Sequence, residues 1–132
     1  MLLGEALYSF LSADDNVIAL VEDRIYPAQN AEIGQLPCIV YQQISGPRAH
    51  SLQGASACAH PRMQLNCFAA TYLEAKQLAD AVRKAIDGYK GIWLTLDIYG
   101  VILLNELDVY EDDPQIHRVI LDFKIWHYEA KT

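Results

Sequence analysis

Residues 116–128 carry the pattern that most restricts the fold of this chain, because apolar and polar side chains alternate there with a period of two. The apolar side chains of one parity are Val119, Leu121, Phe123 and Ile125. Successive side chains of a β-strand point to opposite faces of a sheet, so the alternation predicts a strand with one buried face. Such a face is typical of an antiparallel sheet and requires something apolar to cover it.

Residues 71–87 predict a helix that is able to cover that face. Thr71 and Glu74 have the spacing of a capping box, in which each side chain bonds a free N–H group at the helix start. Gly88 follows as a left-handed helix cap. The residues that recur at helical spacing are Ala75, Leu78, Ala79, Val82 and Ile86.

The first part of the chain predicts two further helical segments. Residues 2–13 place apolar side chains at helical spacing, and Asp14 or Asp15 is suited to cap a short helix that runs to Leu20 or Val21. Pro27 prevents any continuation. Arg24, just before it, is expected to form a structural ion pair at a turn.

Other strands are expected at 36–45, 62–70, 92–98 and 101–110, with Gly100 as a break and 111–115 as a turn. Residues 46–61 are small and polar without a period, which predicts a long flexible loop. The prediction is an α+β fold: a mainly antiparallel sheet of about four strands with an N-terminal helix and one long central helix packed on it. Residues 1–132 are expected to form a single domain.

Charge and cysteine content exclude several classes of function. The formal net charge is −7, from 17 acidic and 10 basic residues, so the chain is not expected to bind DNA tightly. No apolar run is long enough for a membrane span, and no signal peptide is recognised. Three cysteines, an odd number, are expected to be reduced thiols in a cytoplasm.

A search for chemistry gives no convincing active site. Ser51 follows His50, but neighbouring residues in an extended chain point apart, and no nucleophile motif is present. His50, Cys58 and His60 have metal-binding side chains without a metal-site spacing. The acidic residues near 108–113 lack the glycine and glutamate of a calcium loop. We therefore expect no enzyme, no bound metal and no cofactor.

An interface is the remaining kind of site. Phe68 and Trp126 lie on the strand faces opposite the apolar ones, and Tyr128 ends the last strand. Either another chain covers these side chains, or they pack under the N-terminal segment of the same chain. The candidate interface residues, which include part of the predicted loop, are His50, Ser51, Leu52, Gln53, Phe68, Trp126 and Tyr128.

In its order of motifs, the chain resembles the tail completion, or tail-to-head joining, proteins of long-tailed phages and prophages. The likeness spans nearly the whole chain. The segments that carry it are Ala6-Leu7-Tyr8, Asp23-Arg24-Ile25-Tyr26-Pro27, Leu36-Pro37-Cys38-Ile39-Val40-Tyr41, Arg62-Met63-Gln64-Leu65-Asn66-Cys67-Phe68-Ala69, Thr71-Tyr72-Leu73-Glu74-Ala75, Asp108-Val109-Tyr110-Glu111 and His117-Arg118-Val119-Ile120-Leu121-Asp122-Phe123.

The resemblance implies a structural virion protein of the head–tail junction, located in the virion tail and in the host bacterial cytoplasm during assembly. Similar proteins form hexameric rings that terminate the tail tube, contact the tube protein and the head-completion connector, and let DNA pass through the lumen without specific binding. Two alternatives stay open: a protein-binding adaptor that is a monomer or dimer, and an enzyme that uses His50 or Cys58.

Overall fold

The computed structural model describes residues 3–28, 34–45, 48–51, 54–112 and 115–128, with the backbone alone over 48–57. These residues contain three helices: α1 (Leu3–Ser12), α2 (Asp15–Val21) and α3 (Tyr72–Ile86). They also contain eight strands: β1 (Ile25–Pro27), β2 (Cys38–Ser45), β3 (Arg48–Ser51), β4 (Gly54–Ala59), β5 (Arg62–Ala69), β6 (Gly91–Trp93), β7 (Leu96–Glu111) and β8 (Ile116–Tyr128).

The helix starts follow from the capping residues that the sequence predicts. One carboxylate oxygen of Asp14 accepts hydrogen bonds from the backbone N–H groups of Asn16 and Val17, both at 3.0 Å, and so begins α2. The hydroxyl of Thr71 accepts one from the N–H of Glu74 at 3.2 Å and begins α3. The α+β class and these helix positions are confirmed.

The strands form one sheet with β8 at its centre. On one side of β8 the order is β5, β2 and β1, with β4 and β3 beside its C-terminal end; β7 and then β6 lie on the other side. Only β1 and β2 pair in parallel among the described strands. The mainly antiparallel character that the sequence predicts is confirmed.

The predicted numbers of strands and helices are wrong. The sequence predicts about four strands, one N-terminal helix and one long central helix, whereas the described residues form eight strands and three helices. Three short or irregular strands lacked a sequence signal. β1 has three residues, and β3 and β4 consist largely of small side chains that hide the alternation. The predicted loop over 46–61 is therefore a β-hairpin in its described part, while its flexibility remains a prediction.

The predicted strand over 92–98 is also wrong, because the chain reverses within it. Leu94 and Thr95 form a two-residue turn, after which β7 pairs with β6 and runs on through Gly100 to Glu111. Leu94 has a φ of 56°, which such turns require but which Asn or Gly usually supplies. Gly100 lies at a register shift against β8, so it bends the strand without ending it.

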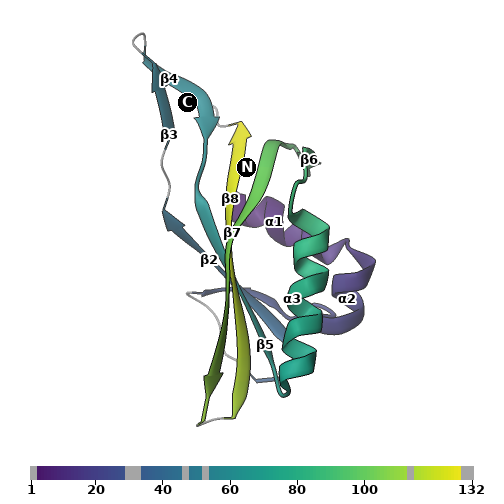
Figure 1. Cartoon of the computed structure of the whole chain (residues 1–132). Coiled ribbons are helices and arrows are strands. Elements are labelled where there is room, and N and C mark those ends of the chain that lie inside the picture. The colour runs from purple at the N-terminus through teal and green to yellow at the C-terminus, as the bar shows by residue number, and fades with distance from the viewer. Residues whose placement is uncertain (1–2, 29–33, 46–47, 52–53, 113–114, 129–132) are drawn as a thin grey trace.

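All three helices lie on the same face of the sheet (Figure 1). Their apolar stripes pack on Met63, Leu65 and Cys67 of β5 and on Val119, Leu121, Phe123 and Ile125 of β8. Phe10, Tyr89 and Trp93 add an aromatic cluster where α1 meets β6. This face is the main core, as the alternation in 116–128 predicts.

Two hairpins project from opposite ends of the molecule (Figure 1). One is formed by β3 and β4. The other is formed by the far ends of β7 and β8, which pair as far as Glu111 and Ile116 on either side of the predicted turn. No described helix lies against β3 or β4 (Figure 1).

Candidate interaction surfaces

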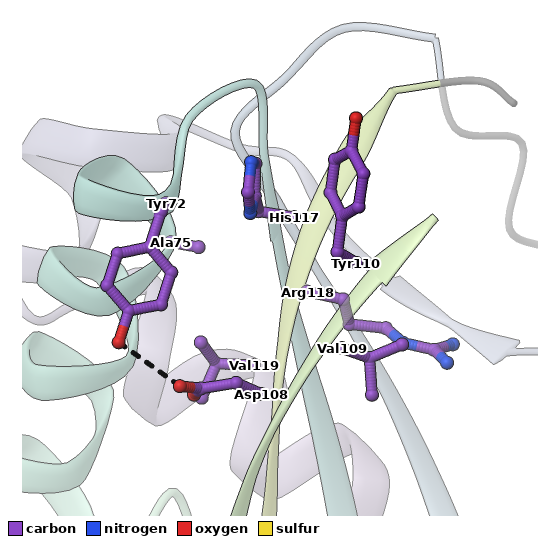
Figure 2. A pocket seen from close by; sticks show the side chains of 8 residues that line it. All are labelled: Tyr72, Ala75, Asp108, Val109, Tyr110, His117, Arg118 and Val119. Carbon is purple, nitrogen blue, oxygen red and sulfur yellow. Dashed lines mark hydrogen bonds between the residues drawn. The ribbon is translucent and has the colours of Figure 1, made fainter. Parts of the chain in front are cut away.

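A hollow of about 220 Å³ lies between the start of α3 and the hairpin of β7 and β8. Figure 2 shows its walls, which are mostly apolar and aromatic. The lining residues are Tyr72, Ala75, Asp108, Val109, Tyr110, His117, Arg118 and Val119.

Two of the polar side chains that line this hollow bond each other. The hydroxyl of Tyr72 donates to a carboxylate oxygen of Asp108 at 3.2 Å, as Figure 2 shows. The imidazole of His117 lies 4.6 Å from the ring of Tyr110 and 6.1 Å from that of Tyr72, measured between ring centroids. Mostly apolar and aromatic walls suit an inserted apolar side chain of another protein better than a reacting substrate.

Lys76 fixes the hairpin to α3 beside this hollow. Its ammonium group lies 2.8 Å from a carboxylate oxygen of Glu106 and 3.2 Å from one of Asp108. The hydrogen bond to Glu106, helped by Asp108, raises the pKa of Lys76 above its ordinary value. Lys76 is therefore a structural cation, and not a base that could take part in catalysis at neutral pH.

The second surface is the sheet face opposite the helices. Ile102 and Leu107 of β7 are exposed there, and Ile120 of β8 is half-buried beside Leu107. Trp126 is half-buried as well, with the ammonium group of Lys124 5.3 Å from its ring centroid. No described helix covers this face (Figure 1). It combines aliphatic, aromatic and charged groups, as the surfaces of assembling subunits do.

The candidate interface residues do not form one patch. His50 and Ser51 lie in β3, while Leu52 and Gln53 lie outside the described residues. β4 of the same hairpin pairs with β8 at Cys58 and Tyr128, so His50 and Ser51 belong to the end of the sheet that carries Tyr128.

Phe68 lies elsewhere, in a small second core. It is 6% exposed and packs with Cys38, Val40 and Ile116, while Tyr26 and Leu36 pack against the same cluster. The guanidinium of Arg118 lies 5.6 Å from its ring centroid. Little of the Phe68 ring is therefore left for a partner. For this side chain, packing under the N-terminal part of the chain is the alternative that the structure supports.

Sequence reasoning missed the hollow, although one signal for it was present. A turn over 111–115 between two predicted strands places Tyr110 opposite His117, and the observed register pairs these two residues. Tyr72 could not be placed from the sequence, because the packing of α3 on β8 decides its position. The arrangement as a whole defines a class: an α+β subunit whose candidate sites are surfaces for other proteins.

The comparisons with known proteins identify the family within that class. The sequence profile of the family described as "Tail completion protein gp17" matches residues 5–128, so the chain belongs to this family of phage tail completion proteins and is a structural virion protein of the tail. No curated protein matches the chain.

A solved structure supports the fold. A chain from the "Virion of native gene transfer agent (GTA) particle" superposes with a TM-score of 0.79 at 22% sequence identity. The match covers 96% of this chain and 94% of the other. At this identity the likeness shows a shared fold, and the almost complete coverage means that the fold is shared over its whole length.

Neither surface shows a catalytic or metal-binding arrangement in the part of the chain that the structure describes. No group of three or more His, Cys, Asp or Glu side chains there could hold a metal ion. Over the same residues, no helix has the length and apolar character needed to cross a bilayer.

Proposed function

We propose that this protein forms a ring, hexameric in the assembled tail, that terminates the tail tube and joins it to the head connector. Membership of the tail completion family supports a role in the tail. The observation that supports ring formation is the sheet face opposite the helices. This face exposes Ile102 and Leu107 and is therefore suited to burial against further protein. The partners are copies of the chain, the tail tube protein and the head-completion protein.

The charge of the chain fits a ring around passing DNA. With a net charge of −7, the subunit does not neutralise phosphates, and an acidic lumen repels the nucleic acid backbone. The DNA therefore slides through without specific binding. The protein has no catalytic role in this function, and the tail subunits are assembled in the host bacterial cytoplasm.

Electron microscopy and light scattering of the purified protein at high concentration test the ring. Rings of six subunits are expected, and stable attachment to purified tail tubes should stop their growth. A protein that stays monomeric or dimeric with and without tubes would instead favour the adaptor alternative.

A pair of variants tests the sheet face. Leu107→Asp places a charge on the sheet face opposite the helices and should abolish ring formation. The fold should survive, because Leu107 is 52% exposed. Leu73→Asp is the control: Leu73 is 65% exposed at the start of α3, where an acidic residue suits the helix dipole. Equal assembly of both variants would contradict a role for this face.

A further inference from the structure

The first half of β7 has a protected edge. β6 pairs with Leu96 to Ile98, and the end of α3 covers the next residues. The N–H of Gly88 donates to the carbonyl oxygen of Val101 at 2.9 Å, and the N–H of Leu103 donates to a carboxylate oxygen of Asp87 at 3.0 Å. Groups that would attract another strand are thus bonded within the chain as far as Leu103.

The second half of β7 is different. The register shifts between Leu103 and Asn105, and the strand then continues to Glu111 with β8 on one side only. No described strand pairs with its other side over Asn105–Glu111. This segment is a free strand edge at the hairpin that projects from one end of the molecule (Figure 1).

The register identifies which backbone groups are free. In an antiparallel pair, alternate residues point both of their backbone groups away from the partner. Leu103, opposite Phe123, is such a residue, because its N–H bonds Asp87. The extra residue at the register shift belongs to β7, so the alternation along β8 is not interrupted. The residues opposite Leu121, Val119 and His117 therefore also point their backbone groups outward. The outward residues of the free edge are Glu106, Asp108 and Tyr110.

The opposite end of the molecule carries a second free edge and the opposite charge. β3 is the last strand beyond β4. β3 and β4 contain Arg48 and no acidic residue. Residues 105–112, at the far end of β7, contain the four acidic residues Glu106, Asp108, Glu111 and Asp112. Lys76 pairs with the first two and Arg118 with the third. The hairpin of β3 and β4 therefore carries one positive charge, while the four carboxylates at the far end of β7, less Lys76 and Arg118, leave two net negative charges there.

We propose that the free edge of β7 over Asn105–Glu111 pairs with β3 of a second copy of this chain, so that subunits join head to tail. Strand addition satisfies the free backbone groups, and the opposite charges select the two ends for each other. Because the two edges differ, the contact is heterologous and repeats from copy to copy, as a closed ring needs. This inference rests on the proposed ring and names the contact that would close it.

A proline at an outward position tests the strand edge. Asp108→Pro removes an outward N–H that β8 does not use, and edge strands tolerate such a residue. Asp108→Ala is the matched control, because it loses the same contacts to Lys76 and Tyr72 and keeps the N–H. We expect assembly to weaken about tenfold or more for the proline relative to the alanine variant, with similar circular dichroism. Equal assembly would overturn the pairing.

A charge reversal tests the other edge. Arg48→Glu should weaken assembly, because it replaces the positive charge of the hairpin with a negative charge that the acidic end of β7 repels. Lys84→Glu makes the same change of net charge on α3, away from both edges, and should assemble like the wild type. If the two variants assemble equally well, the charge pairing is wrong.

Mixing gives the sharpest result. Arg48→Glu copies retain a good β7 edge, and Asp108→Pro copies retain a good β3. At a concentration just above the assembly midpoint of the wild type, each variant alone should stay mostly monomeric, and an equal mixture should give dimers and nothing larger in analytical ultracentrifugation. A mixture that stays monomeric would overturn the head-to-tail contact. If the wild type itself never assembles, the proposed ring fails; if it assembles and the variants do too, only this inference fails.

Discussion

At the scale of single residues, Arg24 holds the junction between α2 and the sheet. The residue as a whole is 8% exposed. Its guanidinium pairs with Glu22 at 3.0 Å and donates to the carbonyl oxygen of Pro37 at 2.8 Å. The structural ion pair that the sequence predicts is confirmed. A buried cation with these partners positions two segments and leaves no free group for a ligand.

Replacing this side chain should therefore affect folding more than assembly. Arg24→Ala leaves the Pro37 carbonyl without its bond, and we expect a loss of about 1–3 kcal/mol in the free energy of unfolding. Urea denaturation measures the loss, with Lys84→Ala as an exposed control. A folded Arg24→Ala protein with a large defect in ring formation would contradict this structural role.

The cysteines give a prediction that depends on pH. Burial raises the pKa of Cys38 from 9.0 to about 11 and raises that of Cys67 as well. A neutral thiol is favoured in the fold, so its contribution to stability is complete below pH 9 and is lost as the pH rises toward 11. The melting temperature should fall over that range, and Cys38→Ala should show a shallower fall. A slope that is the same in both proteins would assign the effect to other groups.

At the scale of the elements, the turn between β6 and β7 contains a strained residue. Leu94 has a φ of 56° and is 55% exposed, so a glycine there removes steric strain and gives up little burial. Leu94→Gly should increase the free energy of unfolding by about 1 kcal/mol. Thr95→Gly, next to it and without a positive φ, should not stabilise. The two urea midpoints provide the comparison.

The contact between α3 and β7 depends on Lys76. Lys76→Ala removes both ion pairs and leaves Glu106 and Asp108 close together on one strand face. The pairs are partly exposed, so the loss in global stability should be at most about 1 kcal/mol. Local opening should be more evident: amide hydrogen exchange over residues 105–111 should accelerate, and salt should reduce the difference. Unchanged exchange would show that the backbone pairing alone holds the hairpin.

At the scale of the whole molecule, the hairpin of β3 and β4 is expected to become ordered by contact with a neighbouring subunit or the tube. Arg48 is the sole trypsin site between Arg24 and Arg62. Trypsin should cut there in the free subunit and should cut much more slowly in assembled rings, as mass spectrometry of the fragments will record. Equal cleavage in both states would count against ordering on assembly.

The sequence by itself determined the elements whose signals lie within a few residues of one another. The capping side chains of Asp14 and Thr71 and the apolar periods of α1, α3 and β8 were sufficient for the α+β class. The family, too, was recognisable from the order of short motifs. These features are local, because helix and strand periods are repeated along the chain itself.

Only the tertiary structure decided which residues become available to a partner. The hairpin of β3 and β4 has no apolar period, and it exists through pairing with β8 at Cys58 and Ala59. Phe68 became a core residue because the segment near Tyr26 covers it, while the face near Leu107 stayed bare. Such outcomes depend on contacts between residues far apart in the chain. No local sequence pattern determines which distant segment will pack against a given strand.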